Sequence, residues 1–347
     1  MGGSNQPGPD GSAVSFRQLF DEFLVLSVAR GRSPTTIHGY RTAISGFWLP
    51  EIGDLLIGDL TVHALDTLYA RMRTRERPAA TATIRKYHAI LSAALTQAVK
   101  WHWIPTNVAR LATLPRAEHA DVATPTPEEV RALIAACTLE SDVLGMFVTV
   151  AAVTGCRRGE LAALTWCDYE EHVLHIKGSA YNVGGAKGVK TTKTGWHRRV
   201  PVHERLAEVL ESWRSSRTEE AGQLGLAYGA ESFVFSNSPG GMSPVNINTV
   251  STQFRRVAQR LGLHSIHLHS LRHFAATQLI SGGIDPRTAA SRLGHANPSL
   301  TLRIYAHATS ESDLEAAEVG ARILQLQPSD VVAPAETDRS ARDPAGE

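Results

Sequence analysis

Histidine, arginine and tyrosine side chains suited to phosphate chemistry gather in residues 264–307. His269 and Arg272 are three positions apart, His295 follows a Leu-Gly pair, and Tyr305 comes ten residues later. Fixed cations and forked donors stabilise the charge that develops on the non-bridging oxygens of a phosphodiester under attack. Tyrosine, with an ordinary pKa of about 10, needs a neighbouring cation or base to become a good nucleophile. The stretch therefore predicts binding of, and attack on, a phosphodiester.

A second arginine is supplied from far upstream. The segment T-G-C-R-R-G-E-L at 154–161 places Arg157 at a predicted turn between two apolar helices, with Glu160 three residues later. Arginine is always charged and can donate two hydrogen bonds to one phosphate. A glutamate in a first helical turn also suits the helix dipole. Two roles therefore stay open for Glu160, helix stabilisation and support of the site.

A metal site is the alternative interpretation of the histidines. His269 and His273 are four residues apart, which is also the spacing of zinc ligands on a helix. Three more histidines lie close in sequence: His264, His267 and His295. The stretch lacks the glutamate of an H-E-x-x-H motif and any cysteine pair, so the sequence favours a site without metal.

Taken together, the motifs resemble those of the tyrosine site-specific recombinase (phage integrase) family. They are T-G-x-R-x-G-E-L around Arg157, H-x-x-R at His269, L-G-H at His295 and a tyrosine ten residues later, Tyr305, in the family's order. The resemblance extends over roughly residues 15–322, nearly the whole chain.

The resemblance implies a catalytic lysine on a β-hairpin, eight residues before a strand end of the Val-Pro type. That position is occupied by Lys193, eight residues before Pro201, with Lys190 close enough to remain an alternative. It also implies that Arg157 is the first catalytic arginine and that Glu160 supports it.

In an enzyme of this family, Tyr305 would attack the scissile phosphate, form a 3′-phosphotyrosyl bond and release a 5′-hydroxyl. Lys193 would protonate the leaving oxygen, with His269 as an acid or base helper. The phosphorane would be stabilised by Arg157, Arg272 and His295. Because the ester keeps the energy of the phosphodiester, the resemblance implies no metal, ATP or other cofactor.

The same resemblance implies the partners. They would be double-stranded DNA recombination sites, paired by a homotetramer that exchanges strands through a Holliday junction, with an accessory DNA-bending protein as a further candidate. A capping box at Ser312 and Glu315 predicts a C-terminal helix of the kind the family passes to a neighbouring protomer.

Two rival functions share part of this chemistry. A type IB topoisomerase would relax supercoils without pairing sites, and the L-G-H motif with an N-terminal helical domain favours a recombinase. A regulator that binds DNA without cutting it would be expected to have lost one of the six site residues, and this chain has all six.

Composition and charge agree with a DNA-binding protein in a reducing compartment. The 347 residues are 43% hydrophobic and 20% charged, without an apolar run of membrane-spanning length or a signal peptide pattern. Three cysteines without a C-x-x-C motif lead us to expect a cytoplasmic, nucleoid-associated protein. Residues 311–347 carry a net charge of −6 while the whole chain carries +1, so residues 1–310 carry +7.

The expected fold class is mainly α with a small antiparallel β-sheet, divided into an N-terminal helical core-binding (SAM-like) domain and a C-terminal tyrosine-recombinase catalytic domain. The expected boundaries are 1–14 for a disordered N-terminus, 15–112 for the core-binding domain, 113–125 for a linker, 126–325 for the catalytic domain with its exchange helix, and 326–347 for a disordered acidic tail.

Four amphipathic helices are predicted in the N-terminal domain. Their starts fall at Ser15, at Ser33 before Pro34, at Thr61 and near Thr81. Arginines crowd the turn between the third and fourth helices, and more basic residues lie on a later strand. Contact with DNA phosphates is predicted for Arg71, Arg73, Arg75, Arg77, Arg85, Lys86, Arg198 and Arg199.

In the catalytic domain, Thr126 with Pro127 and Glu129 predicts a capped helix, and an apolar helix near 144–153 then leads to the first arginine. Strands are predicted at 172–176 and 199–202, with a Gly-Gly turn between them.

Four further helices are predicted, the first two near 204–215 and 250–261. In the third, apolar residues at helical spacing put His269 and Arg272 together on one helix, ended by Gly282 and Gly283. A following helix runs from an N-cap at Asp285 to Gly294.

Overall fold

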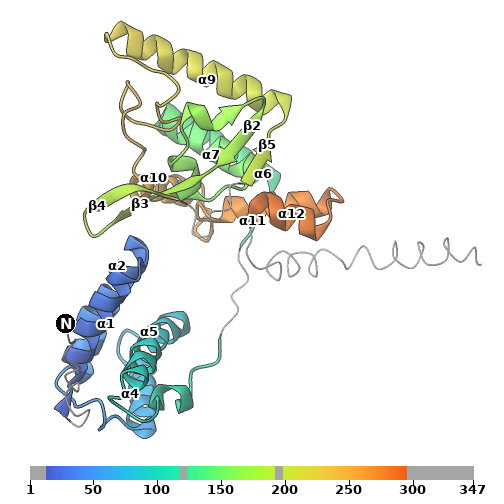
Figure 1. Ribbon diagram of the computed structural model, residues 1–347. Coiled ribbons are helices and arrows are strands. Elements are labelled where there is room, and N and C mark those ends of the chain that lie inside the picture. Colours follow the sequence, from blue (N-terminus) through green and yellow to red (C-terminus); the bar gives the residue numbers. More distant parts are fainter. Residues whose placement is uncertain (1–12, 118–122, 192–197, 295–347) are drawn as a thin grey trace, which may run out of the picture. The chain divides into compact units, whose positions relative to one another are not determined.

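The computed structural model describes residues 13–117, 123–191 and 198–294 (Figure 1). Within these residues the chain is mainly helical with small antiparallel sheets, as the sequence predicts. Lys193, His295 and Tyr305 lie outside the described residues, as do the expected exchange helix and acidic tail.

The four predicted N-terminal helices are present, and they share one apolar core around Trp48 and Phe20. Side-chain oxygens of Ser15, Ser33 and Thr61 each accept a hydrogen bond from a backbone N–H three residues later, which satisfies donors that the first helical turn leaves unpaired. The helices are α1 (Phe16–Ala29), α2 (Pro34–Ala43), α3 (Leu49–Ile52), α4 (Val62–Thr74) and α5 (Thr81–Lys100), followed by the 3₁₀ turn η3 (Val108–Leu111).

The second predicted helix continues farther than its apolar stripe indicates. A π-helical turn, η2 (Ile44–Trp48), joins α2 to α3. Phe47 and Trp48 are consecutive in sequence, yet both are buried. The indole N–H of Trp48 donates to the backbone oxygen of Tyr87 at 3.2 Å, which fixes the end of this turn against α5.

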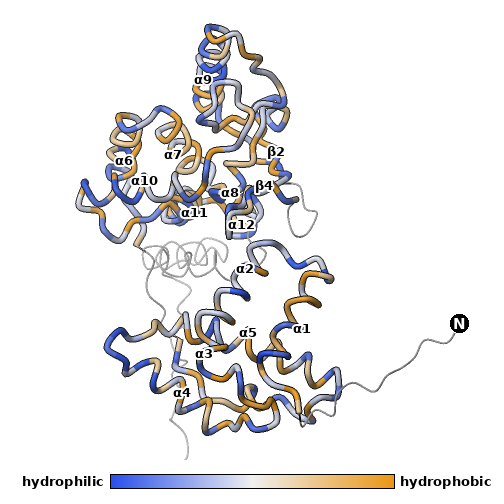
Figure 2. Tube along the Cα trace, turned by 90° about the vertical axis from the view of Figure 1, so that its left-hand side faces the viewer, coloured by the Kyte–Doolittle hydropathy of each residue, from blue (hydrophilic) through white to orange (hydrophobic). Residues whose placement is uncertain are grey.

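Three helices surround the turn that carries Arg157: α6 (Pro127–Glu140), α7 (Asp142–Thr154) and α8 (Arg158–Ala162). The predicted capping box of Thr126 and Glu129 starts α6. Helix α7 is apolar on nearly every side (Figure 2) and almost entirely buried. It is only 13 residues long; across the described ranges, no helix has both the length and the apolarity to cross a membrane.

The strands form two antiparallel sheets where the sequence predicts one. After the 3₁₀ turn η4 (Trp166–Asp168), one sheet has the order β1 (Tyr169–Glu170), β2 (Val173–Ile176) and β5 (Arg198–Pro201). The other is a hairpin of β3 (Gly178–Val183) and β4 (Ala186–Thr191). The predicted turn residues Gly184 and Gly185 both have positive φ, at 58° and 81°, as a tight hairpin turn requires. Strands β3 and β4 pair with each other, which separates them from the first sheet.

The remaining helices are α9 (Glu204–Gln223), α10 (Ile247–Arg260), α11 (Ser270–Ser281) and α12 (Pro286–Leu293). Helix α9 runs past the predicted end at 215. Arg217 in its second half is buried and donates to the backbone oxygen of Ser238 at 3.2 Å, so this half also has an inward face.

The prediction that one helix carries both His269 and Arg272 is wrong for the histidine. Helix α11 begins at Ser270, and His269 is the residue before it. The carbonyl oxygen of His269 accepts the backbone N–H of Arg272 at 3.1 Å and that of His273 at 3.4 Å, which is the position of a helix N-cap.

The described residues from Phe274 to Gly294 belong to a second compact unit. In it Ala276 packs with Leu293 of α12. The predicted caps of α12 are present: a side-chain oxygen of Asp285 accepts two backbone N–H groups at 3.0 Å, and Gly294 ends the helix with a φ of 70°.

Gly159 in α8 allows this helix to lie against β3. A Cβ atom at position 159 would come within 2.5 Å of Ser179 Oγ and 2.8 Å of the backbone oxygen of Ala180. Because a strand backbone yields little, we expect Gly159→Ala to lower the free energy of unfolding by about 1–3 kcal/mol in urea denaturation.

The matched control is Gly222→Ala in α9, where nothing lies within 4 Å of the added Cβ. Helix propensity alone then acts, so this variant should be neutral or more stable by up to about 1 kcal/mol. Equal unfolding midpoints for the two variants would contradict the contact between α8 and β3.

Candidate active site

The turn between α7 and α8 fixes Arg157. Helix α7 ends at Gly155, whose φ of 64° lies in the left-handed region that favours glycine. The hydroxyl of Thr154 donates to the backbone oxygen of Val150 at 2.6 Å and accepts the backbone N–H of Cys156 at 3.3 Å. Arg157 follows with an extended backbone and precedes the first residue of α8. Each position of the T-G-C-R segment therefore has a role in ending one helix and starting the next.

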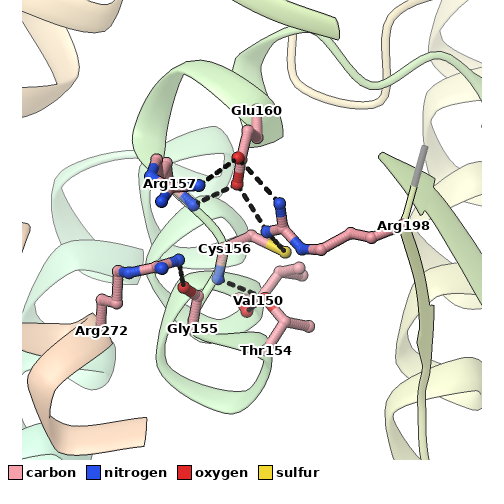
Figure 3. Close-up of polar contacts among 8 residues, drawn as sticks. All are labelled: Val150, Thr154, Gly155, Cys156, Arg157, Glu160, Arg198 and Arg272. Carbon is pink, nitrogen blue, oxygen red and sulfur yellow. Dashed lines mark hydrogen bonds and ion pairs between the residues drawn. The ribbon is translucent and has the colours of Figure 1, made fainter. Parts of the chain in front are cut away.

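Glu160 binds two arginines with one carboxylate (Figure 3). Its Oε2 accepts the backbone N–H of Arg157 at 2.8 Å, and its Oε1 accepts Arg157 Nη1 at 2.9 Å. Arg198 donates Nη1 to Oε1 at 2.8 Å and Nη2 to Oε2 at 2.6 Å. The side chain of Glu160 is 5% exposed, so a buried negative charge is compensated by two guanidinium groups.

The charge of Glu160 persists at neutral pH. Burial by itself would raise the pKa of this carboxyl, but the hydrogen bonds and positive charge of Arg198, joined by those of Arg157, hold the pKa below its ordinary value. Glu160 combines the two roles that the sequence leaves open, since it caps α8 and also holds an arginine of the site.

Arg272 reaches the same turn from α11. Its Nη1 donates to the backbone oxygen of Gly155 at 2.9 Å, and the residue is 3% exposed. Burial, followed by the positive charge of Arg157, lowers the pKa of Arg272 to about 10, so it stays charged at neutral pH. Arg157 and Arg272, far apart in sequence, are thus bound to neighbouring parts of one turn (Figure 3).

His269 lies at the surface before α11, with its ring centroid 5.0 Å from that of His273 in an edge-to-face arrangement. Partial burial of the ring, followed by the charges of His273 and Arg272, lowers the pKa of His269 to about 4. The imidazole is therefore neutral at pH 7 and can accept a proton. In the part of the chain that the structure describes, no three His, Cys, Asp or Glu residues are grouped to hold a metal ion.

An open pocket collects these groups. In the catalytic region its lining includes Arg157, Arg158, Arg255, His269 and Arg272, and among the described residues no Asp or Glu lines it. A concave surface with clustered guanidinium groups and without carboxylates is suited to a phosphate backbone.

The two arginines predicted to bind phosphate on β5 differ in environment. Arg199 is exposed and lies opposite His175 of β2, whereas the side chain of Arg198 is 14% exposed and bound to Glu160. Sequence reasoning missed this contact. The signal for it was the alternation of strand residues, because Arg198 shares a face with Val200, which is 0% exposed.

The lysines are only partly described. Lys190 lies in β4 opposite Ser179 and lines the same pocket as Arg157 and Arg272. Lys193 lies outside the described residues. Lys193 therefore stays the predicted catalytic lysine, with Lys190 as the alternative.

The arginines predicted to bind phosphate near the end of α4 have internal partners. Arg71 and Arg75 both pair with Glu51, at 3.6 Å for Arg71. Arg73 Nη1 donates to the hydroxyl of Thr81 at 2.6 Å. Arg71 and Arg73 belong to the last turn of α4 and not to the connection after it. The remaining predicted residues of this region, Arg77, Arg85 and Lys86, are exposed.

A second basic surface in the N-terminal region was missed by the sequence analysis. Helices α1 and α5, with the turn after α1, form a concave surface lined by Arg30, Arg32, His88 and Lys100. Arg30 Nη1 donates to the side-chain oxygen of Gln97, a neutral group, at 3.1 Å. Its basic residues are spread over 70 positions, so no local run of charge marks the surface in the sequence.

Two curated relatives illustrate the similarity of the sequence. The chain is 30% identical over 195 residues to the ICEBs1 integrase of Bacillus subtilis, a match that covers 55% of this chain and 52% of that protein. It thus spans about half the length of that relative. It is 29% identical over 313 residues to the tyrosine recombinase XerC of Corynebacterium efficiens, covering 86% of this chain and 88% of XerC.

The fold is shared with solved structures of integrases. The Tn1549 transposon integrase in complex with transposon right end DNA superposes with a TM-score of 0.72 at 19% identity, over 90% of this chain and 100% of that one. The sequence model of the Phage integrase family matches residues 124–312, more than half of the chain. This match spans the turn of Arg157, its partner Glu160, and Arg272, and it shows that the chain belongs to the phage integrase family.

Proposed function

We propose that this chain is a site-specific DNA recombinase of the integrase type, which cleaves and rejoins DNA through a tyrosine. The observation that carries the proposal is the attachment of Arg157 and Arg272 to a single turn, 115 positions apart in sequence, in a pocket rich in arginine. Two fixed guanidinium groups beside each other match the charge of a phosphodiester in its transition state. Membership of the phage integrase family supports the proposal.

In the proposed reaction, Tyr305 Oη attacks the phosphorus atom and the bond from phosphorus to the 5′ oxygen breaks. The tyrosine becomes a 3′-phosphotyrosyl ester, and Lys193 gives its proton to the 5′ oxygen. His269, neutral at pH 7, accepts the proton that Tyr305 Oη loses when it attacks. Arg157, Arg272 and His295 stabilise the phosphorane. Rejoining is the reverse, with the 5′-hydroxyl of a partner strand as nucleophile.

The proposed partners are two double-stranded DNA recombination sites, held by a homotetramer that exchanges strands through a Holliday junction. C-terminal helices are exchanged between the protomers, and a DNA-bending protein acts as an accessory. The helices of residues 15–112 serve as the core-binding domain and residues 126–325 as the catalytic domain. The proposed place of action is the cytoplasm, on the nucleoid. Type IB topoisomerase activity and binding without cleavage are the outcomes that the following experiments distinguish from recombination.

The first experiment tests the covalent step. The flanks of the gene are first searched for a repeated core sequence, which is built into a nicked suicide duplex. On this duplex the wild-type chain should form an SDS-stable adduct in the presence of EDTA. Tyr305→Phe should bind the same DNA with wild-type affinity but form no adduct, because the ring lacks the attacking oxygen.

An adduct that persists in Tyr305→Phe, or that maps to Tyr181, would show that another residue is the nucleophile. Activity lost in EDTA and restored by Zn²⁺ or Mg²⁺ would support the metal alternative. Relaxation of a supercoiled plasmid without any requirement for a flanking repeat would support the topoisomerase.

The second experiment separates Lys193 from Lys190. A 5′-bridging phosphorothiolate leaves without protonation, so a general acid is not needed on this substrate. Lys193→Ala should be at least about 100-fold slower than wild type on ordinary DNA and within a few-fold of it on the sulfur substrate.

Arg157→Ala and Arg272→Ala are the controls, since charge stabilisation is needed with either leaving group and both should stay slow. Lys190→Ala should show modest losses on both substrates, because a phosphate contact is weakened. Rescue of Lys190→Ala by sulfur, with Lys193→Ala inactive on both, would exchange the roles of the two lysines.

The third experiment compares the two basic surfaces of the N-terminal region. Removing the charge that binds one phosphate reduces the slope of log affinity against log salt by about 0.9. We expect Arg30→Ala with Arg32→Ala to reduce this slope by about two in filter binding or anisotropy. Arg71→Ala with Arg75→Ala should reduce it by less, because Glu51 already neutralises part of that charge. A larger reduction of the slope for the Arg71 and Arg75 variant would show that DNA binds the surface predicted from the sequence instead.

A further inference from the structure

We propose that Arg198 is a positioning residue: its bidentate contact with Glu160 sets the guanidinium of Arg157 for phosphate, and it makes no DNA contact of its own. The inference rests on the proposed recombinase function of this site. It reassigns a residue whose sequence context predicts a phosphate contact on β5.

The directions of the two guanidinium groups support this division. The side chain of Arg198 is 14% exposed, and its Nη atoms reach both oxygens of Glu160 and, at 3.6 Å, the buried Cys156 Sγ. The side chain of Arg157 is 43% exposed and places Nη1 on Glu160 Oε1. Arg198 therefore faces the interior, while much of Arg157 remains open to the pocket.

Competition for the carboxylate gives the contact its effect. A buried carboxylate gains most from a forked guanidinium that meets both of its oxygens. Arg198 takes that geometry, and Arg157 Nη1 shares a single oxygen. Without Arg198, the buried charge of Glu160 would be compensated best by drawing the fork of Arg157 onto itself. The arginine needed for phosphate would then be turned inward.

The strand that carries Arg198 is firmly held. Val200, two positions later on the same face, is 0% exposed and pairs with Leu174 of β2. The ion pair between Arg198 and Glu160 therefore joins the first sheet to the N-terminus of α8. A displacement of about 1 Å at a reacting group can cost about 100-fold in rate, so this contact sets the cleavage rate without touching the substrate.

The test uses the full-length chain and the nicked suicide duplex from the flanking repeat. Arg198→Met should slow single-turnover cleavage by about 100-fold, with the DNA affinity and its salt slope unchanged. The decisive arm is a double-mutant cycle with Arg157→Ala. If Arg198 acts through Arg157, then adding Arg198→Met to Arg157→Ala should slow cleavage by no more than about 2-fold.

Arg199→Met on the same strand is the control for a phosphate contact and should lower the salt slope by about one. A slope reduction of that size in Arg198→Met would overturn the proposal. So would a double variant, Arg157→Ala with Arg198→Met, whose cleavage is slowed by the product of the two single effects. Adduct formation by the wild-type chain is measured first. Its absence would count against the recombinase function, whereas the results above concern Arg198 alone.

Removal of one partner from a buried ion pair can unfold a protein, so a second pair of variants keeps the test decisive. Arg198→Met with Glu160→Gln removes both charges and should keep a melting temperature near wild type. It should cleave faster than Arg198→Met alone, because no buried charge then draws Arg157 inward. Arg198→Lys keeps the charge without the fork, and its cleavage rate should lie between those of wild type and Arg198→Met. A folded double variant as slow as Arg198→Met, or wild-type cleavage by Arg198→Lys, would overturn the proposal.

Discussion

A buried carboxylate shared by two arginines is the interaction on which the rest of this site depends. An isolated charge away from water is strongly unfavourable, so Glu160 requires cations close to both of its oxygens. Arg198 and Arg157 supply them from a strand and from a helix start. The same carboxylate accepts the backbone N–H of Arg157 and so caps α8, which ties the arginine, the helix and the sheet into one unit.

The second attachment of the site uses the backbone. Helix α7 is buried on nearly all sides, and it ends in a left-handed glycine whose carbonyl oxygen accepts Arg272 Nη1. Because α7 has little freedom to shift within the apolar core, the position of Gly155 is well determined. The two arginines are thus held by two different parts of a single turn, the carboxylate of Glu160 and the carbonyl of Gly155.

The local signals of the sequence predicted the helix starts and the identity of the arginine turn. Caps at Thr126 and Asp285 are found where the pattern places them, because a cap needs only residues that are close in sequence. What the sequence did not reveal depends on distant contacts. The partner of Arg198 lies 38 residues away, and the pairing of β3 with β4 alone divides the predicted sheet into two. His269 lies one residue before α11, at its N-cap position, and apolar spacing alone does not show at which residue a helix begins.

The bond between Arg272 and the carbonyl of Gly155 has a consequence for how such a chain can diverge. A carbonyl oxygen is present whatever side chains surround it, so substitutions elsewhere around the turn leave this anchor in place as long as the glycine remains. In the proposed recombinase, residues that face the DNA can then vary without disturbing the groups that cut it. Target choice and chemistry can therefore evolve as separate traits of one scaffold.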